Sequence, residues 1–215
     1  MKMKYILLTF LAAAICGSRA VAQQPTPSPD LSKYEVGMDF TSMTSGPEGT
    51  VFGNGARFSY NLNRHLALEA AAYFSSGLLE RANTGSITEG LFGVKAGQRF
   101  EKFGIFGKVR PGFLNYSRGA FDFVPTGSGG SFPFVGVYHH RTDFALDLGG
   151  VFEFYPTKNM VVRLDAGTTL DRIGRRQVQS LSADPTNGVI VPFVFESPGY
   201  TRHHFQFISG VAYRF

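Results

Sequence analysis

The chain has 215 residues, a single cysteine, no tryptophan and a formal net charge of +5 at pH 7. Its length fits one domain, and a lone cysteine excludes an internal disulfide. Without Lys2, Lys4 and Arg19, 18 basic residues face 16 acidic ones, a net charge of +2. Such a small charge removes the main argument for binding nucleic acid, so we expect no nucleic-acid partner.

Residues 1–22 have the features of a secretory signal peptide. Lys2 and Lys4 precede an apolar run over 5–15, and an A-x-A cleavage motif follows at 20–22. The apolar run is too short to cross a bilayer as a helix, and no later segment reaches eighteen consecutive apolar residues. The sequence therefore predicts an exported protein whose signal is removed.

The segment after the expected cleavage site is short and rich in proline. Residues 23–33 contain three prolines and predict an extended lead-in. Cys16 offers an alternative start as a lipoprotein acceptor, but the bulky Ile15 before it disfavours lipidation. The main domain is expected to begin at residue 34.

Eight segments beyond residue 33 alternate between apolar and polar side chains with a period of two, as β-strands with two different faces do. Each has about ten residues, the length with which a tilted barrel strand crosses a bilayer. Among β-structures, only a closed sheet pairs every backbone group inside a membrane. The pattern predicts an all-β, eight-stranded antiparallel up-and-down transmembrane β-barrel over 34–215. Its strands are expected near 34–42, 51–62, 66–74, 92–100, 105–113, 144–154, 160–166 and 205–215.

Three residues interrupt this pattern. Pro111 lies inside the fifth strand, where it cannot donate a ladder hydrogen bond, so we expect a bulge or kink there. Gln98 and Ser209 fall on the face that should meet lipid, and we expect both near strand ends.

The connections between strands alternate in length. Short ones are expected at 63–65, 101–103 and 156–159, and long ones at 43–50, 75–88, 115–141 and 171–200. Outer-membrane barrels have short periplasmic turns and long extracellular loops, so this alternation predicts that both termini lie in the periplasm. Apolar residues alternate around 121–137 and gather at 189–195, which predicts that the two longest loops form hairpins suited to protein or lipid contact.

The chain ends in Tyr213-Arg214-Phe215, which closes an alternating aromatic strand. With its eight alternating segments and this ending, the chain resembles the small eight-stranded outer-membrane barrels of the OmpA/OmpX/OmpW type. The resemblance covers essentially the whole mature chain. The resemblance implies a multi-pass protein of the bacterial outer membrane, surrounded by lipid. It also implies that Tyr213 and Phe215 form a signal for the barrel-assembly machinery. No motif for a specific activity accompanies it.

The polar faces of the first seven strands carry as many acidic as basic residues. The interior of an eight-stranded barrel is just wide enough for side chains to fill, and buried charges are tolerable only when paired. We therefore expect an internal ion-pair network that plugs the barrel, with an ion- or proton-conducting file as the alternative. Its members are Glu35, Asp39, Arg57, Glu69, Lys95, Arg99, Lys108, Arg110, Asp147, Glu153, Arg163 and Asp165.

Histidines near the ends of the expected strands are the other candidates for chemistry. Neighbouring residues on a strand point to opposite faces, so an adjacent pair is a poor metal chelate. We expect no catalytic residue, no cofactor and no metal site. A rim-located lipid-modifying enzyme remains an alternative, and it would have to use His139, His140, His203 and His204 with Asp143, Asp171 or Ser197.

The sequence thus favours a non-enzymatic outer-membrane barrel with a structural or surface-contact role in the envelope. A narrow channel or transporter for small or apolar solutes is the first alternative. A soluble lipocalin-like barrel is the alternative at the level of the fold, and it would turn its apolar face inward.

Overall fold

The structure is a computed structural model, which describes residues 32–44, 49–76, 85–125, 134–183 and 190–215. The expected signal peptide and most of the expected lead-in lie outside these residues. In the described part of the chain, no helix has the length and apolarity needed to cross a membrane.

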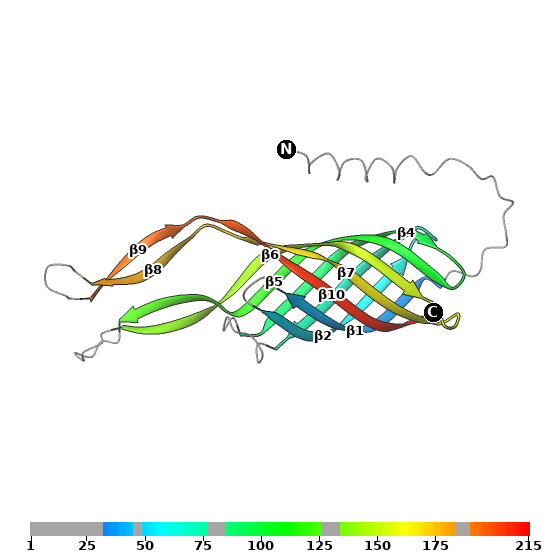
Figure 1. The fold of residues 1–215 in the computed structure, drawn as a ribbon, viewed down its shortest axis with the longest axis horizontal. Coiled ribbons are helices and arrows are strands. Elements are labelled where there is room, and N and C mark those ends of the chain that lie inside the picture. Colours follow the sequence, from blue (N-terminus) through cyan, green and yellow to red (C-terminus); the bar gives the residue numbers. More distant parts are fainter. Residues whose placement is uncertain (1–31, 45–48, 77–84, 126–133, 184–189) are drawn as a thin grey trace, which may run out of the picture. The chain divides into compact units, whose positions relative to one another are not determined.

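Eight antiparallel strands close into one barrel, as predicted (Figure 1). Neighbours in sequence are neighbours in the sheet, except that β10 follows β7 after an intervening hairpin. The strands are β1 (Tyr34–Thr44), β2 (Thr50–Asn61), β3 (Leu66–Ser75), β4 (Ile87–Arg99), β5 (Phe103–Pro125), β6 (Phe134–Phe154), β7 (Met160–Ile173) and β10 (Tyr200–Arg214).

The first and last strands form the seam of the barrel. Their register pairs Glu35 with Arg214 and continues to Thr44 with Phe205. At the terminus, the Tyr34 N–H donates to the Phe215 carbonyl (3.0 Å) and the Phe215 N–H donates to the Tyr34 carbonyl (2.9 Å). The final residue therefore completes the closure of the sheet.

The side chains are sorted by the period of two. Apolar residues point outward, with Met38 73% exposed and Phe92 61% exposed, whereas Arg110 and Asp147 on the opposite face are fully buried. This arrangement is the reverse of a soluble barrel, because the apolar surface lies outside and the charges inside.

The connections alternate in length as predicted. Among the short turns, the one after β2 is held by Asn63, whose Oδ1 accepts the N–H groups of His65 (2.8 Å) and Leu66 (2.9 Å). Short side-chain caps of this kind are why asparagine favours turns. The other two short turns join β4 to β5 and β6 to β7.

The two longest connections continue as β-structure beyond the barrel, as the apolar patterns predicted. β5 and β6 stay paired up to Pro125 and Phe134. Between β7 and β10, the strands β8 (Arg176–Ala183) and β9 (Ile190–Ser197) form a separate two-stranded sheet. We call the paired segments Ala120–Pro125 with Phe134–His139 the first ribbon, and β8 with β9 the second ribbon.

Of the bulge or kink predicted at Pro111, the structure shows no register shift but an interrupted ladder toward β4. Pro111 pairs with Leu146 without a shift, and the register of β5 with β6 changes only between Tyr116 and Ala120. Toward β4, pairing is interrupted opposite Arg110 and Pro111 but resumes in the same register. One missing donor weakens the ladder locally, and the pairs on either side keep the register.

Ser209 also departs from its prediction, because it lies midway along β10 rather than near an end. It pairs with Phe40 and Leu164 on the neighbouring strands. A shallow hollow at this point is open to the outside of the barrel. Its walls include Met38, Phe40, Leu164, Ser209 and Val211.

Candidate functional site in the barrel interior

All twelve residues predicted to line the interior are buried inside the barrel. Each has a partner of opposite charge within 4.0 Å. Four of these contacts join strands that are not neighbours in the sheet, so those partners meet across the lumen.

Glu69 on β3 and Arg163 on β7 form the centre of the network. Arg163 donates to both carboxylate oxygens of Glu69, with Nη2 3.0 Å from Oε2, and also to Asp165 two residues away on its own strand. Lys95 Nζ lies 3.4 Å from Glu69 Oε1, and Arg110 Nη1 lies 3.6 Å from Oε2. One carboxylate therefore faces three cations, and the bidentate arginine fixes its orientation.

A second group lies beside the centre, on β5, β6 and β7. Arg110 donates from Nε (2.8 Å) to Asp147 Oδ2, and its Nη2 lies 2.6 Å from the same oxygen. Lys108 Nζ bridges Asp147 (3.0 Å) and Asp165 (3.1 Å). Because lysine and arginine from one strand share these carboxylates, no charge in this group stands alone.

The end of the lumen nearest the short turns is closed by a floor of charged and aromatic side chains. Glu35 accepts from Arg214 Nε (3.0 Å) and from Asn61 Nδ2 (2.9 Å), and Arg99 Nη2 lies 3.4 Å from it. The Arg214 guanidinium stacks 4.5 Å from the Tyr155 ring centre. Arg214 lies on the eighth barrel strand, outside the seven strands whose charges predict the network.

Asp39 and Arg57 form a pair at the side of the lumen. Arg57 Nη1 lies 2.9 Å from each oxygen of Asp39, and the Tyr73 hydroxyl donates to Oδ2 (3.2 Å). Gly210 on β10 leaves room for this carboxylate, since a Cβ at Gly210 would lie 2.0 Å from Asp39 Oδ1.

Glu89 on β4 is a buried acid that the sequence reasoning missed. Its Oε2 accepts from Gln206 Nε2 (2.7 Å), and its Oε1 has no hydrogen-bond partner. Gln206 also bonds to the hydroxyls of Thr41 and Thr169. Among the described residues, no cation lies within ion-pair distance of Glu89, so amide and hydroxyl groups replace charges at this level of the lumen.

The half of the lumen nearest the long connections is filled by apolar side chains. Met43, Val51, Ile87, Leu114, Tyr116 and Ala145 form one buried cluster. These residues come from β1, β2, β4, β5 and β6, so the cluster spans most of the circumference. We call this cluster the apolar plug.

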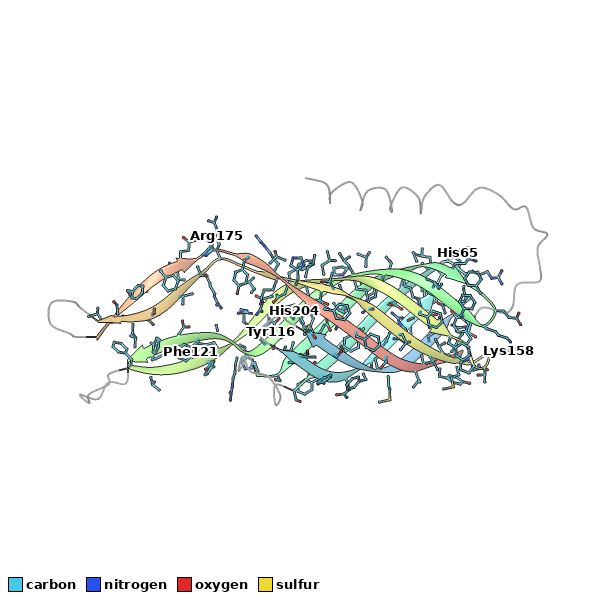
Figure 2. The ribbon with its side chains drawn as sticks, viewed as in Figure 1. His65, Tyr116, Phe121, Lys158, Arg175 and His204 are labelled. Atoms are coloured by element: carbon cyan, nitrogen blue, oxygen red, sulfur yellow. The ribbon has the colours of Figure 1, made fainter. Side chains whose placement is uncertain are left out.

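Polar groups surround Asp171 beside the apolar plug. Tyr116 donates to Asp171 Oδ2 (2.9 Å), as does Arg202 Nη2 (2.7 Å), and His204 Nε2 lies 3.5 Å from the same oxygen. Figure 2 shows Tyr116 and His204 at the end of the barrel from which the ribbons extend. The Arg202 guanidinium therefore balances the charge of Asp171. Tyr116, a member of the apolar plug, also helps to fill this end of the lumen.

The other rim residues are not brought together. His139 and Asp122 approach to 3.7 Å on the exposed first ribbon, whereas Ser197 pairs with Arg176 in the second ribbon. His140 and His203 are exposed. Within the described ranges, no group of three histidine, cysteine, aspartate or glutamate side chains could hold a metal ion.

A closed antiparallel sheet with lipid-type residues outside and a charged, filled interior defines a class of protein, the bacterial outer-membrane β-barrels. The sequence agrees with this class. The family model of the outer membrane protein beta-barrel domain matches residues 8–215, so the chain belongs to this family. It is a membrane protein of the bacterial outer membrane whose outer surface contacts lipid.

Several solved structures are distantly similar. Neisserial surface protein A is 16% identical, with 86% of this chain and 98% of that chain covered and a TM-score of 0.49. Ail of Yersinia pestis, crystallised with the heparin analogue sucrose octasulfate, is 14% identical, with 85% and 96% covered and a TM-score of 0.44. The N-terminal barrel domain of Pseudomonas aeruginosa OprF is 11% identical, with 84% and 97% covered and a TM-score of 0.42.

None of the curated proteins matches this sequence. At identities this low, the solved structures say nothing about what the chain binds. The family and the interior of the barrel therefore carry the functional argument.

Proposed function

We propose that this protein is a closed, non-enzymatic outer-membrane barrel that contributes to the integrity of the envelope and makes surface contacts through its two ribbons. The observation that carries the proposal is the filling of the lumen. An ion-pair network occupies one half of the lumen and the apolar plug lies in the other half.

The filled lumen argues against a channel or transporter. A conducting path needs a continuous column of water, and the bidentate arginine contacts and the apolar plug leave little space for one. Catalysis at the rim is also disfavoured, because Ser197 and the exposed histidines contact no common group among the described residues.

The ribbons support the contact role. Phe193 and Phe195 on the second ribbon stack with ring centres 5.8 Å apart, yet each is 45% exposed. On the first ribbon, Val135 is 50% exposed and Tyr138 is 45% exposed. Apolar groups exposed to this extent, on segments that extend beyond the barrel, suit binding to another protein or to lipid.

We further propose that both termini lie in the periplasm and that the ribbons face the outside of the cell. The alternation of short and long connections supports this orientation. Protease added to intact cells should then cut first within the long connections 115–141 or 171–200. Cutting confined to the turns at 63–65 or 155–159 would invert the orientation.

Tyr213 and Phe215 form the proposed signal for the barrel-assembly machinery. Deleting Phe215 would also remove its backbone hydrogen bonds to Tyr34 at the seam, so the substitution Phe215→Ala is the better test. We expect F215A to lower the amount of folded barrel in the outer membrane, while the refolded variant stays nearly as stable as wild type. Unchanged membrane levels, or a large loss of stability in vitro, would contradict a role in assembly.

The contact role can be tested in a strain that lacks the gene. Wild type is compared with a variant in which residues 178–195 are replaced by an Asn-Gly turn, so that the barrel is kept. We expect both to restore resistance to a hydrophobic dye, and only wild type to restore attachment of cells to surfaces. Full restoration of attachment by the variant would contradict the role of the second ribbon, and a deletion without either defect would contradict the proposed function.

A further inference from the structure

Arg172 lies on the outer face of β7, at the end of the barrel nearest the long connections. The outward-facing residues before it on β7 include Leu164 and Ala166, both exposed to the lipid side. Arg172 pairs with Phe144 on β6, which is 56% exposed and belongs to the apolar surface. The guanidinium therefore lies where the apolar surface of the barrel ends.

The hydrogen-bonding capacity of Arg172 is mostly unused. Its Nη1 donates to Thr201 Oγ1 (3.2 Å) on β10, whereas a guanidinium has five N–H donors. Among the described residues, no carboxylate forms an ion pair with it. The carboxylates nearest in register, Asp143 and Asp171, point into the lumen and are paired with Arg141 and Arg202.

His203 adds a second donor on the same face. Thr201 is the direct partner of Arg172, and His203 is two residues further along β10. Same-face neighbours offset by two residues are about 7–8 Å apart, a separation that one phosphate group with its oxygens can span. The exposed His203 ring carries an N–H donor whether it is neutral or protonated.

The outer face of β1 and β2, the next two strands beyond β10, is different at this level. Thr44 on β1 and Thr50 on β2 face each other there, and their hydroxyls are bonded at 2.7 Å. At this level, β1 and β2 therefore carry neutral threonines on the outer face, where β7 and β10 carry Arg172 and His203.

We propose that Arg172 and His203 form a binding site for the phosphate of a membrane-lipid headgroup. Three features fit this ligand: a planar fork that matches phosphate oxygens, a neighbouring imidazole donor, and an apolar surface directly below for acyl chains. Basic residues at a membrane surface attract anionic lipids in this way. The proposal of this site requires only that the barrel lies in a membrane, as its family does. The proposed orientation would in addition place the site in the outer leaflet.

The site can be tested by native mass spectrometry of the refolded barrel released from detergent. The probes are lipid A, phosphatidylglycerol and diacylglycerol, which has no phosphate. The variants are Arg172→Gln and His203→Gln, and the matched control is Arg175→Gln. Arg175 is exposed nearby but has its own partner, Glu196, at 4.0 Å.

We expect R172Q to lower the fraction of barrel carrying a phosphate lipid about fivefold, with a smaller decrease for H203Q. R175Q should match wild type, and diacylglycerol should bind all four proteins equally. A decrease for lipid A alone would identify its phosphates as the ligand, and a decrease for both lipids would identify any phosphate headgroup. Equal binding by R172Q and wild type, or an equal decrease in R175Q, would overturn the proposal.

This result is independent of the orientation. If protease were to cut the short turns of intact cells while R172Q still lost lipid, the site would stand and would face the inner leaflet. If the cuts fell in the long connections and R172Q bound normally, the orientation would stand without the site.

Discussion

The two halves of the lumen are filled by different chemistry within one barrel. The half nearer the short turns holds acids and bases that share partners, as Glu69 does with Arg163, Lys95 and Arg110. The half nearer the long connections holds the apolar plug, the contacts of Gln206 with Glu89 and Thr169, and the pair of Asp171 with Arg202 at its end. The comparison teaches that the effect of losing a buried group should depend on which half contains it.

The largest effect is expected from Glu69→Ala. This change would leave three cations in a closed space without their shared carboxylate, and breaking a buried pair typically costs about 3–5 kcal/mol. Urea unfolding of the refolded barrel in lipid vesicles measures the loss. Glu101→Ala, at an exposed turn, is the control and should be neutral. Equal stability of both variants would mean that water solvates the lumen.

A smaller effect is expected from Gly210→Ala. The new Cβ would lie 2.0 Å from Asp39 Oδ1 and 2.5 Å from the Met38 carbonyl oxygen, so the Asp39 carboxylate would have to leave its position beside Arg57. Overpacking of this kind costs about 1–3 kcal/mol. Gly150→Ala is the matched control, because no atom lies within 4 Å of its Cβ. Equal losses in the same unfolding assay would place the cause in the backbone rather than in the ion pair.

The smallest effect is expected from Glu89→Gln, which changes a buried acid outside the ion-pair network. Glutamine keeps an acceptor for the Gln206 amide and removes no ion pair among the described residues. We expect a change of less than about 1 kcal/mol, whereas Glu69→Gln should be strongly destabilising. If both substitutions cost the same free energy of unfolding, the distinction between the ion-pair network and the level of Glu89 would be wrong.

The sequence was sufficient to predict the strands and the faces of the barrel, because a period of two determines which residues point inward. It could not predict the partners. Glu69 and Arg163 are separated by 94 residues and meet across the lumen, so their contact depends on the tilt and stagger of the closed sheet.

Glu89 and the apolar plug were missed for local reasons. Glu89 lies between the end of the expected long loop and the expected start of the fourth strand, but β4 begins already at Ile87. The apolar plug has no charge to mark it, and Leu114 follows the outward Phe113 at the end of the expected fifth strand. The shift between Tyr116 and Ala120 was equally hidden, since no proline occurs between those residues.

The central claim is that the lumen is closed, and planar-bilayer recording of the refolded wild-type protein tests it most directly. Paired charges in one half and the apolar plug in the other predict no stable single-channel current, with small leak currents at most in E69A or R110A. A large and stable conductance of the wild-type protein would contradict the account, because it would require a continuous column of water through the ion-pair network.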